Sequence, residues 1–139
     1  MATPDFETLR VGDSIPPLQK PPFNRLQLAL FAGAAADHNP IHVDDEAARN
    51  GGLPGVIAHG MLTMAFLAEL LGDWVPVHRI RSFSSRFNAM ARLGDAITCR
   101  GVIAGKSEEN GEKRVELELT AENQNGEKAQ LGRAIVALP

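Results

Sequence analysis

The sequence predicts an α+β fold in which a long antiparallel sheet wraps around a single central helix. Residues 61–71 are almost continuously apolar, which is typical of a helix buried on nearly every side. Four stretches of strand character then follow in series through the second half of the chain. A polar loop, with a helical segment on each side, precedes the apolar helix. One buried helix followed by four strands favours a sheet that packs its apolar face on that helix.

The composition indicates one globular domain, residues 1–139, because two ordinary domains need a longer chain. A formal net charge of −3 argues against nucleic acid as the main partner. No apolar run approaches the ~20 residues of a membrane span, and the first residues lack the basic-then-apolar pattern of a secretory signal. The one cysteine, Cys99, cannot form an internal disulfide and is interpreted as a core residue. We therefore expect a cytoplasmic protein without membrane contact.

The first part of the chain should be extended and then helical. Residues 1–22 are rich in proline, and a turn is predicted at residues 11–13. A helix should begin at Asn24, whose side chain can cap it, and run to about Ala36. Leucines and alanines supply its apolar content and favour helix.

Residues 37–42 cannot continue this helix. Pro40 lacks an amide hydrogen and disfavours helical backbone at the residue before it. Asp44 or Asp45 can cap a short second helix, which should end at the glycines after Asn50. The polar segment is therefore predicted to be a loop between two helices.

The apolar helix should end at Gly72 and Asp73, and strands follow it. Apolar and polar residues alternate over residues 115–122, which predicts a strand with one solvated face. A turn at residues 109–111 should join it to the preceding strand. The four predicted strands are residues 80–90, 96–105, 113–122 and 128–138.

The polar loop carries the residues best suited to chemistry. Asp37 and His42 place a carboxylate and an imidazole on a segment fixed by Pro40. An imidazole titrates near neutral pH, so His42 can take and return a proton, and Asp37 can hold a shared water. The structural alternative is an ordinary turn, in which Asp, Asn and Pro are common.

A metal site is a competing interpretation of the same loop. His38 and His42 are four residues apart, which on a helix would place them on one face. Pro40 lies between them and argues against that helix. No Glu follows His38, and no cysteine or further histidine is close in sequence, so we predict no metal.

His59 and Gly60 open the apolar helix. The first amides of a helix have no partners within it and carry partial positive charge, so a thioester oxygen could be stabilised there. Glycine allows a substrate to approach the backbone closely. For His59 the interpretation as a packing residue is favoured. Together, Asp37, His42 and the Gly60 amide supply what the addition of water to a 2-enoyl thioester needs.

These motifs resemble the MaoC-like dehydratase family, which includes (R)-specific enoyl-CoA hydratases and 3-hydroxyacyl-thioester dehydratases. The residues that carry the resemblance are the Asp-His-Asn-Pro-Ile-His run at 37–42 and the Ala-His-Gly-Met run at 58–61. The likeness extends from the turn at 11–13 to the Gly-Arg-Ala run at 132–134. It implies a hot-dog fold over nearly the whole chain.

The resemblance also implies roles for individual residues. Asp37 and His42 would be catalytic, and the Gly60 amide would hold the thioester oxygen. Asn39 and Pro40 would shape the loop, with His59 in support. Some members have a serine nine residues after the histidine of the His-Gly pair, where this chain has Ala68.

The same resemblance implies the partners. The substrate would be an acyl thioester of coenzyme A or of an acyl carrier protein, with no further cofactor. Short members act as homodimers, and others as one half of a heterodimer whose partner lacks the catalytic pair. Because this chain keeps the pair, a homodimer is favoured.

An arginine-rich stretch offers candidate phosphate contacts for such a carrier. Arg79, Arg81 and Arg86 lie there, although solvated strand faces would explain them equally well. In a regular strand Arg79 and Arg81 share one face and Arg86 lies on the other. Several large apolar residues could line an acyl pocket or simply fill the core, and the core is favoured for each: Met61, Met64, Phe66, Trp74 and Phe87.

Two other functions fit the same pattern. A hot-dog thioesterase also needs a carboxylate and a helix that polarises a carbonyl group. A non-catalytic acyl-thioester-binding subunit would need neither Asp37 nor His42. The release of free coenzyme A separates the thioesterase from the hydratase, and binding without turnover would indicate the subunit.

Overall fold

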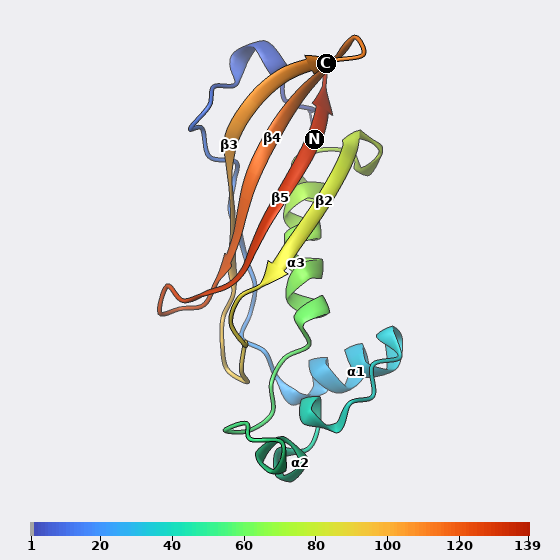
Figure 1. The fold of residues 1–139 in the computed structure, drawn as a ribbon, viewed down its shortest axis with the longest axis vertical. Helices are drawn as coiled ribbons and strands as arrows, with labels where there is room; N and C mark the ends of the chain where they lie inside the picture. The colour runs from blue at the N-terminus through green and yellow to red at the C-terminus, as the bar shows by residue number, and fades with distance from the viewer. Residues whose placement is uncertain (1) are drawn as a thin grey trace.

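The computed structural model describes residues 2–139 and confirms the α+β prediction. A curled five-stranded antiparallel sheet packs on the central helix α3 (Gly60–Trp74), and the strand order is β1-β3-β4-β5-β2 (Figure 1). The strands are β1 (Leu18–Gln19), β2 (Ile80–Phe87), β3 (Thr98–Glu109), β4 (Glu112–Glu122) and β5 (Lys128–Leu138). Strands β3, β4 and β5 follow one another as hairpins, whereas β2 pairs with β5 at one edge of the sheet.

The sheet buries one face because apolar residues alternate along its strands. In β4 the residues that face α3 are Val115, Leu117, Leu119 and Ala121, as the alternation predicts. Asn110 and Gly111 both have positive φ, 53° and 75°, which gives the β3–β4 turn the twist that a two-residue hairpin connection needs. Cys99 is fully buried in β3, as expected.

Several predicted bounds differ from the observed ones. The strand predicted at residues 80–90 ends at Phe87, because the amides of Asn88 and Ala89 both donate to the Ala129 carbonyl and the chain leaves the ladder. Strand β3 begins at Thr98 and continues to Glu109, since its polar end still pairs with β4. The two-residue β1 was not predicted. It lies between two proline pairs, which restrict its length.

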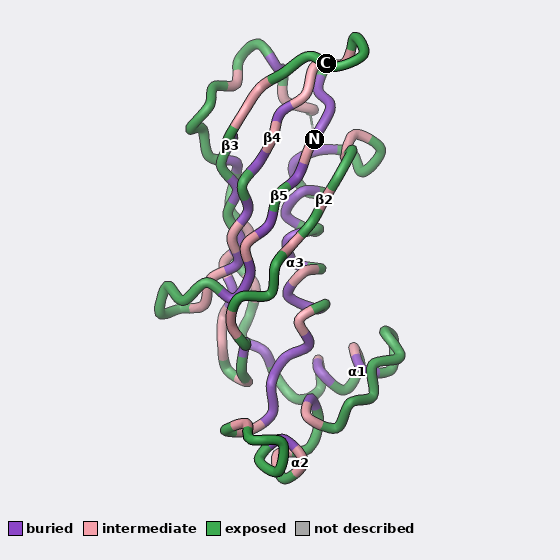
Figure 2. The backbone as a smooth tube through the Cα atoms, in the orientation of Figure 1, coloured by how far each residue is buried: buried purple, intermediate pink, exposed green. Residues whose placement is uncertain are grey.

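Helix α3 differs from its prediction in length and in burial. It continues through Gly72 and Asp73 to Trp74, whose side chain is buried in the core. The expectation of burial on nearly every side is wrong for the single chain. Figure 2 shows buried backbone along the side of α3 that faces the sheet and exposed stretches on its other side. The residues on the open side include Met61, Ala65 and Ala68.

The polar excursion forms two helices near the N-terminal end of α3 (Figure 1). Helix α1 (Arg25–Ala35) begins at Asn24, whose side chain accepts from the Gln27 amide. The one-turn 3₁₀ helix η2 (Pro40–His42) follows, and α2 (Asp45–Asn50) is capped by Asp44. The predictions of the two helices are confirmed, whereas η2 lies within the predicted loop and was not expected. Two further 3₁₀ turns are η1 (Phe6–Thr8) and η3 (Val77–Arg79). Within residues 2–139, no helix has the length and apolar character needed to cross a bilayer.

Candidate active site

The loop that carries Asp37 begins at the C-terminal end of α1. Ala36 ends the helix with φ 54° and ψ 29°, a left-handed conformation that turns the chain sharply. The Asp37 side chain then accepts from the Asn39 amide at 3.3 Å, and the Asn39 side chain accepts from the Ile41 amide at 3.2 Å. With Pro40 at the first position of η2, these bonds give the loop one conformation.

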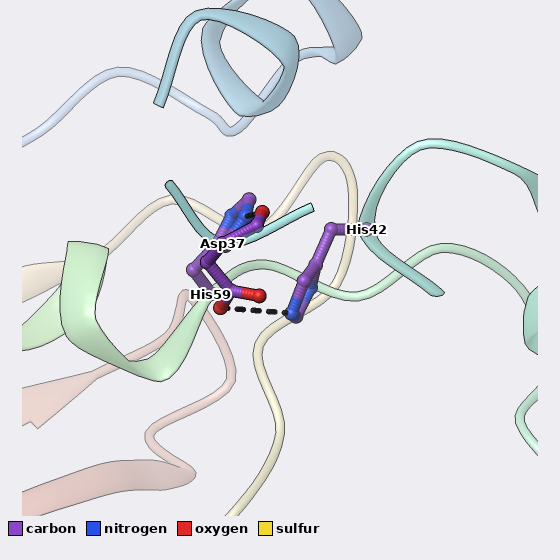
Figure 3. A group of neighbouring side chains, drawn as sticks. All are labelled: Asp37, His42 and His59. Atoms are coloured by element: carbon purple, nitrogen blue, oxygen red, sulfur yellow. Dashed lines mark hydrogen bonds and ion pairs between the residues drawn. The ribbon is translucent and has the colours of Figure 1, made fainter. Parts of the chain in front are cut away.

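His42 is held by the segment that leads into α3. Its Nδ1–H donates to the Ile57 carbonyl at 2.8 Å, and the Ile57 amide donates back to the Ile41 carbonyl at 3.2 Å. His42 is only 7% exposed. Because Nδ1 carries the proton, the lone pair of the neutral ring is on Nε2. That nitrogen faces Asp37 Oδ2 at 3.7 Å, as Figure 3 shows, so the structure brings these two predicted residues together.

His59 completes the cluster and is 1% exposed. Its ring stacks on that of His42, with centroids 3.8 Å apart, and its Nε2–H donates to the Asp37 backbone carbonyl at 3.3 Å. Phe31 packs edge-on against the His59 ring. Burial and the neighbouring His42 lower the pKa of His59, which favours the neutral ring. His59 therefore packs on the His42 ring and is hydrogen-bonded to the backbone of Asp37.

The cluster could be considered as a metal site, because donor atoms of Asp37, His42 and His59 all lie within 4.8 Å of one another. The ring geometry argues against this. A metal ion lies close to the plane of each imidazole that binds it, whereas these two ring planes are 23° from parallel and stacked. His38, the other histidine weighed from sequence, is exposed and lies outside the cluster.

A pocket of about 250 Å³ opens beside this cluster at the first turn of α3. Its lining includes His42, Gly60, Thr63, Phe87 and Gln130. Asp37 does not line the pocket, and its side chain is 47% exposed. A Cβ atom at residue 60 would lie only 2.4 Å from the Phe87 ring, so glycine is required for this close packing. The pocket therefore adjoins both the His42 ring and the start of the central helix.

The remaining predicted residues are distributed between core and surface. Phe66 and Trp74 are in the core, and Met64 is partly buried. Phe87 lines the pocket instead of filling the core. Ala68 is exposed on the side of α3 that faces away from the sheet.

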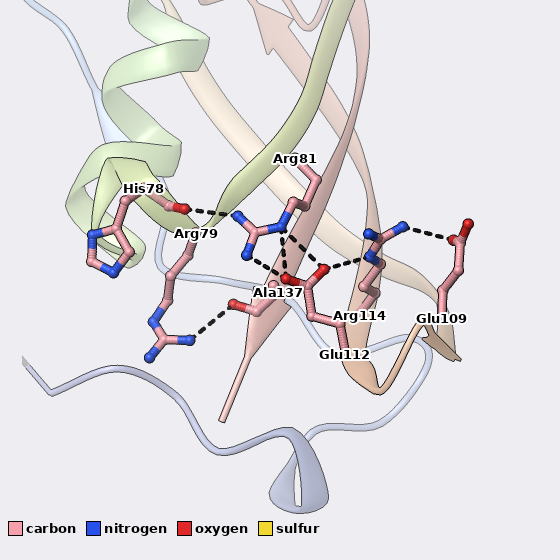
Figure 4. A network of polar contacts seen from close by, with 7 residues as sticks. All are labelled: His78, Arg79, Arg81, Glu109, Glu112, Arg114 and Ala137. Atoms are coloured by element: carbon pink, nitrogen blue, oxygen red, sulfur yellow. Dashed lines mark hydrogen bonds and ion pairs between the residues drawn. The ribbon is translucent and has the colours of Figure 1, made fainter.

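The three arginines do not form one site. Arg81 donates from Nε and Nη2 to the Glu112 carboxylate, and Arg79 donates to the Ala137 carbonyl (Figure 4). Both lie where β2 begins, whereas Arg86 lies where β2 ends, next to Phe87. The strand is not regular, because its register shifts between Ile80 and Ser82.

That irregularity changes which arginines share a face. Arg81 reaches Glu112, and Arg86 lines a hollow with Arg133, which pairs with Glu116. Glu112 and Glu116 alternate with buried β4 residues and so lie on the outer face of the sheet. Arg81 and Arg86 therefore share the outer face, contrary to the regular-strand expectation.

Sequence reasoning missed a buried polar pair at this pocket. The Gln130 side chain on β5 donates to the Gly60 carbonyl at 2.6 Å and accepts from the Ser85 hydroxyl at 2.8 Å. Gln130 is 2% exposed. The available signal was a glutamine at an inward position of a strand whose other inward residues are apolar or glycine.

Comparison with known proteins identifies the family. The MaoC like domain matches residues 8–125. An (R)-specific enoyl-CoA hydratase of Rhodospirillum rubrum is 33% identical over 104 residues, which is 72% of this chain and 69% of that protein. A fatty acid synthase subunit beta of Aspergillus oryzae is 41% identical over 78 residues, 54% of this chain but only 4% of that protein. The family also has hydratases with different subunits, such as a 3-oxo-4,17-pregnadiene-20-carboxyl-CoA hydratase alpha subunit of Mycobacterium tuberculosis. It is 31% identical over 98 residues, 70% of this chain and 30% of that one.

Solved structures show the same fold. An (R)-hydratase from A. caviae superimposes with a TM-score of 0.81 at 28% identity, covering 96% of this chain and 99% of that one. A MaoC-like dehydratase superimposes with a TM-score of 0.88 at 34% identity, covering 99% of this chain and 43% of that longer one. The chain therefore belongs to the MaoC-like dehydratase family, whose members include hydratases and dehydratases, and it has the hot-dog fold.

Proposed function

We propose that this protein is a cytoplasmic hydro-lyase that reversibly hydrates 2-enoyl thioesters to (R)-3-hydroxyacyl thioesters. One observation carries the proposal: the Asp37 carboxylate and the His42 imidazole converge at 3.7 Å beside a pocket at the first turn of the central helix. The relationship to (R)-specific enoyl-CoA hydratases supports the same reaction class.

The reaction needs a base, an acid and a place for negative charge. Asp37 and His42 hold one water, and the pair takes a proton from it as its oxygen bonds to C3 of the enoyl group. The C2=C3 electron pair moves toward the thioester carbonyl, whose oxygen becomes an enolate that accepts from the Gly60 amide. C2 then takes a proton from the pair, so that one water has been added. Dehydration is the same path in reverse.

The structure makes His42 well suited to exchange a proton at Nε2. Its Nδ1–H is committed to the Ile57 carbonyl, and the carbonyl still accepts that bond when the ring becomes positively charged. Asp37 lies close enough to stabilise that charge.

The carrier is coenzyme A or an acyl carrier protein. Of the three candidate arginines, we propose Arg86 for phosphate contact, because it lies next to Phe87 at the end of β2 and its side chain lines a hollow on the outer face of the sheet. Arg79 and Arg81 have backbone and carboxylate partners at the other end of the strand.

We also propose that the protein acts as a homodimer. The open side of α3 exposes Met61, and Phe87 and Met90 are exposed at the pocket. Strand β2 is an edge of the sheet with one unpaired side. A second copy would cover these groups and limit the access of water to Asp37.

The test is hydration of crotonyl-CoA, followed by loss of the conjugated enoyl-thioester absorbance. We expect turnover to the (R)-3-hydroxy product, and a loss of roughly 10²–10⁴-fold in kcat for Asp37→Asn and for His42→Ala. His38→Ala is the matched control, since His38 is an exposed histidine on the same loop outside the cluster. It should keep the wild-type rate.

The same assay separates the other candidate functions. Release of free coenzyme A in place of hydration would indicate a thioesterase. Binding of crotonyl-CoA without turnover, for crotonyl and longer enoyl groups alike, would overturn the homodimeric hydratase and favour a non-catalytic subunit. An (S)-product would contradict the assigned stereochemistry.

A further inference from the structure

We propose that Gln130 is a positioning residue that fixes the carbonyl-binding amide of Gly60, an inference that rests on the proposed function. Gln130 is far from Gly60 in sequence and comes from the opposite layer of the fold, on β5. It nevertheless contacts the first residue of α3 directly and lines the same pocket. It therefore ties the sheet to the start of the helix where the substrate carbonyl would bind.

Gln130 stands in a row of inward β5 residues that are otherwise apolar or glycine. The inward residues of β5 that follow it are Gly132, Ala134, Val136 and Leu138, which are all buried against α3. A glutamine in this row costs desolvation energy unless both ends of its amide are bonded. Packing alone would therefore favour an apolar residue, and the amide indicates a need for its hydrogen bonds.

Both ends of the Gln130 amide are bonded within the protein. Nε2 donates to the Gly60 carbonyl at 2.6 Å, and Oε1 accepts from the Ser85 hydroxyl at 2.8 Å. Ser85 is on β2, two residues before Phe87, whose ring packs on Gly60. The first residue of α3 is thus held by a hydrogen bond from β5 and by a ring from β2.

The hydrogen bond from Gln130 restrains the first residue of α3, since helix ends otherwise fray. His59, the residue that caps α3, makes no side-chain hydrogen bond to the helix amides. Gln130 supplies a restraint that the cap does not. A donor that stabilises an enolate acts best when its direction is fixed before the reaction, and a displacement of about 1 Å can cost roughly 10²-fold in rate.

The test compares Gln130→Leu and Gln130→Glu with the wild type. We expect Gln130→Leu to lower kcat for crotonyl-CoA by roughly 10–100-fold with little change in KM. Gln130→Glu keeps the shape and still accepts from Ser85, but its carboxylate cannot donate to Gly60. Its kcat should therefore recover relative to wild type as the pH is lowered and the carboxyl group gains a proton. Gln19→Leu is the control, at an exposed glutamine on β1.

A spectroscopic measurement separates positioning from a general loss of structure. The infrared carbonyl band of bound butyryl-CoA, which has no double bond to hydrate, should shift to lower frequency in the wild type. The shift should shrink in Gln130→Leu while the circular dichroism spectrum stays unchanged. A variant with an unchanged kcat or an undiminished band shift overturns the inference. Absence of hydration by the wild type contradicts the proposed function instead, and the butyryl-CoA band still decides whether Gln130 holds a carbonyl-binding amide.

Discussion

Gly60 satisfies two requirements that no other residue could satisfy together. Its amide is the first in α3, and the Phe87 ring lies where a side chain would begin. Any substitution must move that ring, which also lines the pocket. The position therefore links the shape of the pocket to the backbone of the helix.

Gly60→Ala should separate activity from stability. The Phe87 ring is half-exposed, so it can turn away from an added methyl group at a small cost in stability. We expect the free energy of unfolding to change by less than about 1 kcal/mol. We expect kcat/KM for crotonyl-CoA to fall at least tenfold, on the order of what a small misplacement costs.

Gly72→Ala is the matched control, because Gly72 lies in the same helix with open space around it. It should gain up to about 1 kcal/mol in stability and keep its rate. Full activity in Gly60→Ala would show that Phe87 relocates without consequence for the pocket.

For single residues, the sequence predicts those whose partners lie close by in the chain. Asp37 and His42 stand on a proline-fixed loop, and the structure places them together. Gln130 could not be found in the same way, because its partners Gly60 and Ser85 are 70 and 45 residues away. Only the sheet register brings them into contact.

Among the elements, β2 and the β3–β4 hairpin are joined by charge at the end of the sheet where β2 begins. Glu112 accepts from both Arg81 and Arg114, and Arg114 also bonds to Glu109 (Figure 4). Hydrogen bonds from Arg81 and then Arg114 lower the pKa of Glu112 to about 2. Because this pKa lies below its ordinary value of 4.5 in the folded protein, the ionised carboxylate stabilises the fold. The contribution of the Glu112 carboxylate to the free energy of unfolding is complete above pH 4.5 and is lost as the pH falls toward 2.

Glu112→Gln should therefore flatten the pH dependence of stability between pH 4.5 and about 2, while leaving the rate of hydration unchanged. Urea denaturation at pH 7, 4.5 and 3 measures this. Glu127→Gln, at an exposed glutamate in the β4–β5 turn, should retain the wild-type slope. Equal slopes for wild type and Glu112→Gln would mean that the network adds nothing to folding.

The elements also show where sequence patterns fail. The sequence indicates Asn24 as one cap and either Asp44 or Asp45 as the other because capping is local, and the structure selects Asp44. The end of α3 was not, because burial of Trp74 outweighs the weak helix propensity of Gly72. Strand β1 was missed because two residues between prolines carry no alternation, and only pairing with β3 defines them.

In the molecule as a whole, one side of α3 and one edge of the sheet lack a covering layer. This follows from the exposure of Met61 and the place of β2 in the strand order. The apolar sequence of α3 predicts burial on nearly every side, but the single chain buries only the side that faces the sheet.

We expect light scattering to give twice the mass of one chain for the wild type, and Met61→Glu to be monomeric and to have lost most of its activity. A buried, unpaired charge is costly, so the dimer should dissociate while the circular dichroism spectrum is retained. Val11→Glu is the control, at an exposed apolar residue in the N-terminal turn. A monomeric, fully active wild type would contradict the homodimer.

The excursion that carries Asp37 and His42 is a separate unit inserted ahead of α3, and the sheet is built by other residues (Figure 1). After a gene duplication, the loop and the sheet could therefore change independently. In the proposed homodimer, one copy would lose the loop chemistry through a few substitutions and still keep the sheet edge that binds its sister. Natural selection then acts on a pair of unequal subunits, one reactive and one a scaffold free to acquire a new surface.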